Sequence, residues 1–319
     1  MLFELIILCS GQDYDSSTRI DIVGVYSFLD CNWINCQTNG HGGCIFFSSA
    51  GSKLTVKRCS FVRGECIGSE DRAGGICVMD CGDVTIELTC FFSCYSNWAP
   101  SFVLWSHGYS LLKSKLDQIS ELFGQSNQHA SVSAGTESHL LSNANISKVT
   151  TPGYYGGIGF HPSANGLLGQ YCQVCDSYTE GMISFFVGSG SFDISHWNLI
   201  NNTIPSGCWF CFHNQNPYVV ISSTIIKSIN LKNSLFSMSG GAILYFNQCS
   251  FDIDNDYGFF GGSVIDCTFL TPVSNHMISI YSNGYCIDMN KKAHTSQQPS
   301  KHKYVALFFT FLHVGYLTF

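Results

Sequence analysis

This 319-residue sequence is poor in charged side chains and especially in arginine. Aspartate, glutamate, lysine and arginine make up 12% of the chain, about half their usual share. Arginine occurs at only four positions, Arg19, Arg58, Arg63 and Arg72, and the formal net charge is −7. Because the chain has no basic stripe, we do not expect a nucleic-acid partner. Hydrophobic residues reach 45%, which excludes a disordered chain and indicates much buried surface or contact with a membrane.

Proline is scarce as well, and the apolar runs lie too close together to be joined by helices. Seven prolines stand against 31 glycines, and β-branched and aromatic residues are plentiful, which favours short strands joined by tight turns. The stretch Asp83–Phe92 alternates apolar and polar residues, as a strand with one buried face does. Since parallel strands joined through a helix need a dozen or more intervening residues, we do not expect a βαβ fold.

A double glycine followed by a short apolar run occurs five times. Gly43 and Gly75 lie 32 positions apart, and Gly241 and Gly262 lie 21 apart. Recurrence at such distances is typical of repeat architectures. If each repeat is one turn of a solenoid, glycine supplies positive φ and a close backbone approach at the same corner of every turn. The glycines predicted to occupy equivalent corners are the second ones of the doublets: Gly43, Gly75, Gly157, Gly241 and Gly262.

Four of the doublets are followed by a Cys-x-Phe motif. On a strand, the first and third residues of this motif point to the same side, so we expect both to lie in stacks inside the coil. Strands of successive turns would then pair in parallel about 4.8 Å apart. The predicted stack residues are Cys59, Phe61, Cys90, Phe92, Cys249, Phe251, Cys267 and Phe269. The sequence therefore predicts an all-β parallel β-helix, with a hydrophobic segment at its C-terminal end.

The best copy of the repeat, Gly240–Phe251, reads "GGAILYFNQCSF". It resembles the repeat of polymorphic outer-membrane proteins, a style also found in protist surface proteins with β-helix domains of pectin-lyase-like shape. The resemblance covers about residues 24–106 and 156–290. Where the pattern has Phe-x-x-Asn, this chain has Gly64 three residues after Phe61. The resemblance implies a right-handed parallel β-helix and a surface setting, and it implies no catalytic site.

The chain divides into four predicted parts. Residues 1–19 are interpreted as a signal peptide or an N-terminal cap, and residues 20–290 as the β-helix. Within the helix, residues 107–150 lack a double glycine and predict an irregular insertion. There, Leu112, Leu116, Ile119 and Phe123 fit one face of an α-helix, although continuation of the coils is an alternative. Residues 291–303 form a polar, basic linker, and residues 304–319 form a hydrophobic tail.

The tail, Tyr304–Phe319, carries no charged residue. As a helix it would span roughly 24 Å, somewhat less than the hydrocarbon core of a bilayer. We interpret it as a short membrane anchor, with a GPI signal or a soluble cap as alternatives. The expected location is therefore the membrane at the cell surface, and secretion is the alternative.

Residues that could carry chemistry are few, and we expect no cofactor and no metal. Asp252, Asp254 and Asp256 could bind Ca²⁺ or form a solvated turn, and Cys172 and Cys175 form an isolated C-x-x-C. Asp193, Ser195 and His196 are triad residue types placed too close in sequence to converge. The 17 cysteines favour either disulfides or buried free thiols, and both remain open. Asn145 and Asn201 begin glycosylation sequons, which matter if the chain is secreted.

These observations predict a non-catalytic scaffold at the cell surface or secreted, structural or of the adhesion type. Its partners would be surface proteins of a host or neighbouring cell, or glycans. The alternative is a carbohydrate-active β-helix enzyme, a lyase or hydrolase, which would need two carboxylates across a groove. A degenerate repeat from a shortened gene copy, without function, is the third hypothesis.

Overall fold

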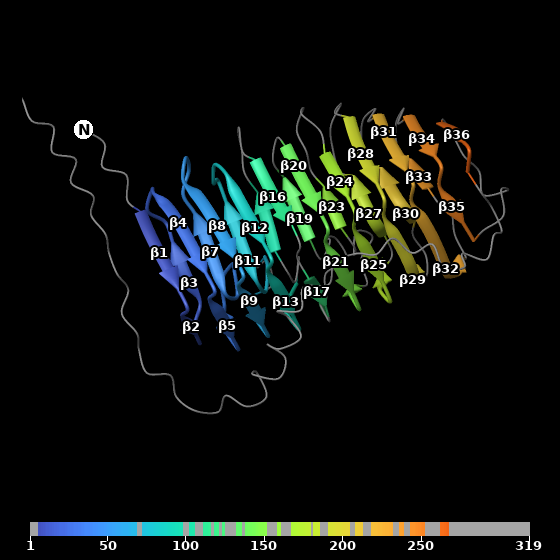
Figure 1. Ribbon diagram of the computed structural model, residues 1–319. Helices are drawn as coiled ribbons and strands as arrows, with labels where there is room; N and C mark the ends of the chain where they lie inside the picture. Colours follow the sequence, from blue (N-terminus) through green and yellow to red (C-terminus); the bar gives the residue numbers. More distant parts are fainter. Residues whose placement is uncertain are drawn as a thin grey trace, which may run out of the picture.

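Three long parallel sheets make up the part of the chain that the structure describes. The computed structural model describes residues 6–68, 72–97, 102–105, 111–115, 118–120, 123–124, 132–135, 138–151, 158–160, 167–179, 181–185, 191–204, 208–212, 218–231, 236–238, 243–252 and 262–267. All regular elements within these residues are strands. The chain passes from the first sheet to the second and the third and then returns to the first, so successive turns lie side by side (Figure 1).

Sheet A receives one strand from each turn and contains 11 strands in chain order. They are β1 (Ile6–Ser10), β4 (Val25–Leu29), β8 (Lys53–Lys57), β12 (Val84–Glu87), β16 (Leu111–Lys115), β20 (Ser138–Ser142), β24 (Leu167–Gln170), β28 (Ser191–Ser195), β31 (Tyr218–Ser222), β34 (Ile243–Asn247) and β36 (Gly262–Ile265).

Sheet B contains 16 strands in two rows, which meet at β29. The first row is β2 (Asp13–Tyr14), β5 (Asn32–Ile34), β9 (Ser60–Val62), β13 (Cys90–Phe92), β17 (Gln118–Ser120), β21 (Asn145–Ser147), β25 (Gln173–Cys175), β29 (Asn198–Ile204), β32 (Ile225–Leu231) and β35 (Ser250–Phe251). The second row is β6 (Gln37–Thr38), β10 (Glu65–Cys66), β14 (Tyr95–Ser96), β18 (Phe123–Gly124), β22 (Thr150–Thr151) and β26 (Tyr178–Thr179).

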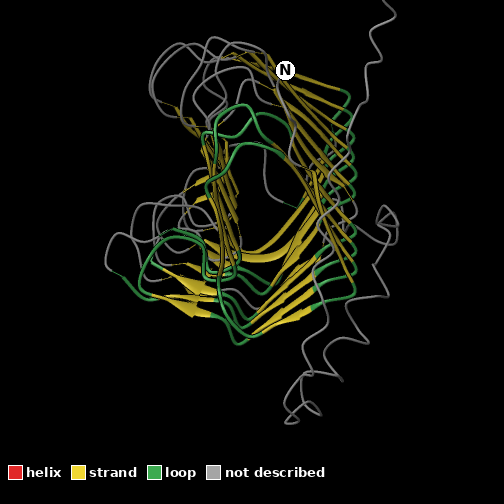
Figure 2. Cartoon of the chain, turned by 90° about the vertical axis from the view of Figure 1, so that its left-hand side faces the viewer, coloured by secondary structure: helices red, strands yellow, loops and turns green. Residues whose placement is uncertain are grey.

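Sheet C contains 9 strands. They are β3 (Thr18–Ile20), β7 (Ile45–Ser48), β11 (Ile76–Met79), β15 (Phe102–Trp105), β19 (Val132–Gly135), β23 (Ile158–Phe160), β27 (Gly181–Phe185), β30 (Cys208–Phe212) and β33 (Phe236–Met238). Viewed along the coil, the sheets enclose a common interior (Figure 2).

The predicted parallel solenoid is confirmed. Neighbouring turns pair in parallel in each sheet: β8 lies between β4 and β12, and Leu54 is in register with Tyr26 on one side and Val84 on the other. Burial alternates along these strands, so that Tyr26, Leu54 and Val84 point inward and their chain neighbours point outward. Sheet A thus has one buried and one outer face, as its alternating sequence predicts.

Two predicted boundaries need correction. The coil does not begin at residue 20, because β1, β2 and β3 already pair with β4, β5 and β7. Residues 107–150 are not an irregular insertion in their described strands, since β16 and β20 continue sheet A in register. Leu112 lies in β16 and Ile119 in β17, so the predicted helix is wrong. Apolar residues spaced by three or four positions can equally fall on two strands separated by a corner.

The described residues contain no helix that is long and apolar enough to cross a membrane. The linker 291–303 and the tail Tyr304–Phe319 lie outside the described residues, so the expected anchor is untested.

Candidate functional site

Every turn bends sharply between sheet A and the first row of sheet B, and we call this bend corner 1. In the first turn Gly11 has positive φ there, and in nine later described turns a residue other than glycine has φ between 48° and 58°. In an L-residue this conformation costs roughly 1 kcal/mol or more. The residues concerned are Asp30, Arg58, Leu88, Asn143, Tyr171, His196, Ser223, Gln248 and Asp266.

The bend keeps its backbone hydrogen bonds. The N–H of Arg58 donates to the carbonyl of Glu87 in the next turn, at 3.0 Å. Two residues later, the N–H of Ser60 donates to Cys31 in the preceding turn, at 2.9 Å. Across the bend, the backbone N–H groups thus switch from partners in the next turn to partners in the preceding turn. Because these groups stay hydrogen-bonded, the contacts offset the strain of positive φ. The same switch recurs between β5 and β6, where Asn35 has φ 56°, and we call that second bend corner 2.

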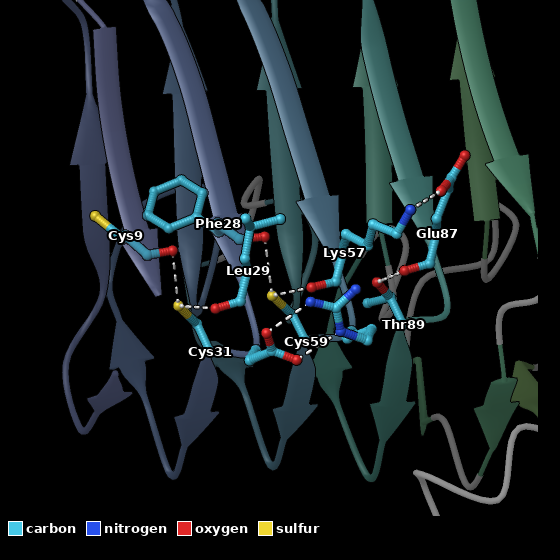
Figure 3. Close-up of polar contacts among 10 residues, drawn as sticks. Cys9, Phe28, Leu29, Cys31, Lys57, Cys59, Glu87 and Thr89 are labelled. Carbon is cyan, nitrogen blue, oxygen red and sulfur yellow. Dashed lines mark hydrogen bonds and ion pairs between the residues drawn. The ribbon is translucent and has the colours of Figure 1, made fainter. Parts of the chain in front are cut away.

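The side chain that follows the strained residue at corner 1 points inward. In three consecutive turns it is Cys31, Cys59 and Thr89 (Figure 3). The Cys59 thiol lies 3.4 Å from the carbonyl oxygen of Lys57 and 3.3 Å from that of Phe28, so it can donate to both strands. Thr89 donates to Glu87 at 3.0 Å in the same way. A small side chain with one donor therefore suits this position.

Burial makes most of the interior cysteine thiols unreactive, at corner 1 and elsewhere in the coil. Desolvation raises the pKa of Cys59 well above its ordinary value, and it raises the pKa of Cys81 and of Cys94 to about 12. A thiol in such surroundings stays protonated at neutral pH and acts as a small apolar side chain. Thirteen cysteines are free in the described part of the chain; eleven of them are buried and two, Cys175 and Cys267, are half-buried, whereas Cys90 is disulfide-bonded.

The predicted stack residues fall into three groups. Cys59 and Phe61 lie together in the interior, and so do Cys249 and Phe251. Cys90 and Phe92 are a correction: Cys90 is only 3% exposed but pairs with Ser60, and Phe91 pairs with Phe61. Thr89 therefore occupies the position of Cys59, and the inward ring is Phe91, whereas Phe92 is only half-buried. In the last copy Cys267 is half-buried, and Phe269 lies outside the described residues.

A stack of aromatic rings that the sequence reading missed fills the interior under β2, β5, β9 and β13. Tyr14 stacks on Trp33 with ring centroids 4.6 Å apart, Trp33 on Phe61 at 4.8 Å, and Phe61 on Phe91 at 4.9 Å. These spacings match the distance between neighbouring strands. The signal was available, because Trp33 follows Cys31 with the same spacing as Phe61 follows Cys59.

The predicted equivalence of the five glycines is wrong. Ile45 pairs with Ile76, so Gly43 aligns with Gly74, and Gly75 aligns with Cys44. Gly262 lies within β36 of sheet A, whereas Gly43 precedes β7 of sheet C. Gly157 and Gly241 lie outside the described residues.

Close approach, and not positive φ, explains Gly43. Its backbone is not left-handed, but a Cβ there would collide with the carbonyl oxygen of Gly74 in the next turn. Similarly, a Cβ on Gly74 would lie 2.5 Å from the carbonyl oxygen of Tyr95. Glycine is needed here because consecutive turns touch backbone to backbone.

The outer face of sheet A changes character along the coil. On β8 and β12, ion pairs link neighbouring turns: Lys53 lies 3.6 Å from Asp83, and Lys57 lies 3.0 Å from Glu87. Large apolar side chains are exposed on β1, where Leu8 is 51% exposed, and on the later strands from β24 onward. The later ones are Leu168 (37% exposed), Tyr218 (46%), Ile243 (44%) and Ile265 (49%).

Two aromatic contacts lie in this later region. Tyr218 is in register with Ile243 on the neighbouring strand, and its ring lies 5.0 Å from that of Tyr245. At corner 1, the ring of Tyr171 stacks on His196 at 4.8 Å. We call Leu168, Tyr171, Tyr218, Ile243, Tyr245 and Ile265 the apolar strip. Tyr245 is half-buried and the others are exposed, and the exposed Asp193 of β28 lies in register with Leu168. Exposed apolar side chains on one surface commonly mark a contact site.

The residues considered for catalysis or metal binding do not converge where they are described. No group of three metal-ligating side chains is present in the described part of the chain. Cys172 is buried at corner 1, whereas Cys175 is half-buried in β25 and accepts a hydrogen bond from Gln173. Of the acidic cluster only Asp252 is described. Asp193 is exposed on β28, and His196 follows at corner 1.

The two glycosylation sequons differ in accessibility. Asn201 is exposed at corner 2 with φ 54°. Asn145 is half-buried within β21, which pairs with strands on both sides, and its Oδ1 atom is buried. Asn201 lies in β29 but is skipped by the pairing with β32, so a surface glycan there would disturb the sheet less than one on Asn145.

No protein-family model matches this chain, and neither a curated protein nor a solved structure matches it. The resemblance to the polymorphic outer-membrane repeat therefore remains a prediction.

Proposed function

We propose that this chain is a non-catalytic scaffold at the cell surface or in secretion, built as a right-handed parallel β-helix of the pectin-lyase-like kind. Right-handed connections are the rule between parallel strands of one sheet. Its function is adhesion-type contact through the outer face of sheet A, with surface proteins or glycans of a host or neighbouring cell as partners.

The apolar strip is the observation that supports this proposal. Strands β31, β34 and β36 are neighbours in one sheet, so Tyr218, Ile243 and Ile265 lie on adjacent turns. An aromatic residue such as Tyr218 offers a large apolar area and a polar hydroxyl at low entropic cost, which suits a contact surface. On β8 and β12, by contrast, lysine side chains are paired with acidic side chains of the neighbouring turn. That part of the face therefore offers charged groups and no comparable apolar surface.

Binding of the purified full chain to intact cells tests the contact surface. The variant Tyr218→Ser/Ile243→Ser should lose at least about tenfold in binding, because hot-spot aromatic side chains dominate such contacts. The matched control, Lys53→Ser/Lys57→Ser, changes the same face at the ion-paired strands and should bind as the unchanged chain does. Equal losses in the two variants, or no loss in either, would contradict a contact at the apolar strip.

The expected location needs its own test. Antibodies raised against residues 6–97 should label intact, unpermeabilised cells or the medium around them. Labelling that appears only after permeabilisation would overturn the surface setting. A glycan on Asn201 and none on Asn145 would support passage through a secretory route.

A further inference from the structure

Cys249 and Cys267 occupy the same position in two consecutive turns of corner 1. Asn247 of β34 pairs with Ile265 of β36, and each cysteine follows two residues later. Residues in register on neighbouring parallel strands have Cα atoms about 4.8 Å apart, within the range that a disulfide bridges. The two side chains also interact: the Cys249 thiol stabilises the thiolate of Cys267, which raises the pKa of Cys249 and lowers that of Cys267.

The surroundings of the two sulfur atoms differ. Cys249 is 1% exposed, and its thiol lies 3.3 Å from the carbonyl oxygen of Ile221 and 3.5 Å from that of Asn247. Cys267 is half-buried, so a small reagent can reach it. The backbone N–H of Cys249 donates to the Cys267 sulfur at 3.3 Å, which stabilises a negative charge there.

These contacts activate Cys267. The Cys249 thiol lowers the pKa of Cys267 to about 7, together with backbone contacts from Cys249 and Ile265, although burial and Asp266 oppose this. The same hydrogen bond, together with burial, raises the pKa of Cys249. A partly exposed thiolate beside a second thiol is the arrangement of a nucleophile and its resolving partner.

A second pair of cysteines in consecutive turns of corner 1 has the same register, but solvent reaches neither of its thiols. The Cys59 side chain likewise lowers the pKa of Cys31. Both residues, however, are 0% exposed. Cys31 and Cys59 therefore form a matched control pair that shares the register and lacks the exposure.

We propose that Cys249 and Cys267 are a thiol–disulfide modification site, which low-molecular-mass disulfides oxidise to a clip between β34 and β36. The Cys267 thiolate attacks one sulfur of the reagent RSSR, forms a mixed disulfide and releases RS⁻. Cys249 then attacks the Cys267 sulfur and releases the second RS⁻, and the two thiol protons go to the leaving groups. Two protein thiols are oxidised and one RSSR is reduced to two RSH.

Oxidised glutathione added to the full folded chain tests this proposal. After the reaction, free thiols are alkylated, the chain is digested and the peptides are identified by mass spectrometry. We expect a Cys249–Cys267 disulfide to form at least about tenfold faster than any Cys31–Cys59 disulfide, because only Cys267 is reachable. A Cys267 that stays reduced while other thiols react, or equal rates for the two pairs, would overturn the proposal.

Single variants separate the two roles. In Cys249→Ser the resolving thiol is missing, so glutathione should remain attached to Cys267. In Cys267→Ser no glutathione should appear on Cys249. Cys59→Ser, the control, should leave the Cys249–Cys267 reaction unchanged. If Cys267→Ser still allows rapid modification of Cys249, the assignment of the nucleophile is wrong.

Discussion

Residues 6–97 and residues 138–252 fill the same interior with different side chains. In the first part, the column under sheet B is the ring stack Tyr14–Trp33–Phe61–Phe91, and the neighbouring corner 1 positions hold small Cys31, Cys59 and Thr89. In the second part, that column is aliphatic at Ile146, Val174, Leu199 and Ile226, and only its last residue, Phe251, is aromatic.

The second part places its large ring elsewhere. Trp197, fully buried, occupies corner 1, where most other described turns have cysteine or threonine and one has Ala144. Its ring reaches over Gly169 of the preceding turn, and a Cβ on Gly169 would lie 2.9 Å from Trp197 Cζ2. Each turn must therefore fill a similar volume of the coil interior, but it need not do so with the same residue at the same position.

Loss of an aromatic ring should have the largest effect. Phe61→Ala is expected to lower the free energy of unfolding by about 4 kcal/mol, because the ring contacts Trp33 and Phe91 and leaves a cavity between them. Val174→Ala, at the same column in the aliphatic part, should cost roughly 2 kcal/mol. Chemical denaturation followed by circular dichroism measures both. Equal losses would mean that the ring stack contributes nothing beyond ordinary packing.

Overpacking the second part should have an intermediate effect. Gly169→Ala is expected to cost about 2 kcal/mol, because the added methyl group meets the Trp197 ring. Gly40→Ala is the control, since its Cβ would have no neighbour closer than 3.8 Å. The double variant Gly169→Ala/Trp197→Phe should cost less than the sum of its single changes. Strict additivity would contradict the direct contact.

The surface pair at corner 1 should have the smallest effect. Arg58 lies 2.7 Å from Asp30 in a two-bond contact that lowers the pKa of the Asp30 carboxyl group. Because the pKa is lower in the folded state than in the unfolded state, the pair stabilises the fold above the unfolded pKa. This stabilisation disappears as the pH falls through the folded pKa.

The size of that effect is limited by solvent. Both side chains are about two-fifths exposed, so Asp30→Asn should cost less than about 1 kcal/mol at pH 7. The difference between the variant and the unchanged chain should shrink as the pH falls below the ordinary pKa of about 3.9 and through the lower folded pKa of Asp30. A constant difference from pH 7 to pH 3 in denaturation experiments would show that charge is not its cause.

The sequence predicted the parallel coil because the repeated apolar runs and the inward Cys-x-Phe motif both follow the period of a strand. Cys59 and Phe61 could be placed in this way. Cys90 and Phe92 could not, because Phe91 and Phe92 are both apolar and a shift of one residue exchanges the two faces. The double glycines gave a wrong prediction because they do not occupy the same place in each turn. Gly43 allows a close backbone contact before a strand of sheet C, whereas Gly262 lies within a strand of sheet A.

The strained corners and the outer face were beyond the sequence reading for separate reasons. Asparagine tolerates positive φ, and Asn35 and Asn201 both adopt it, but Arg58 and Leu88 have no such preference. Hydrogen bonds between turns hold them there, and these depend on the neighbouring turn. The apolar strip likewise combines residues from different turns, such as Leu168 and Ile243, which no local pattern connects.

The parallel register is the central claim, and zero-length cross-linking of the unchanged chain with a carbodiimide tests it most directly. Parallel pairing of β8 with β12 places Lys57 beside Glu87 and Lys53 beside Asp83. Mass spectrometry should therefore find amide cross-links between Lys57 and Glu87 and between Lys53 and Asp83. Cross-links between Lys53 and Glu87 and between Lys57 and Asp83 would instead require antiparallel strands and would contradict the solenoid.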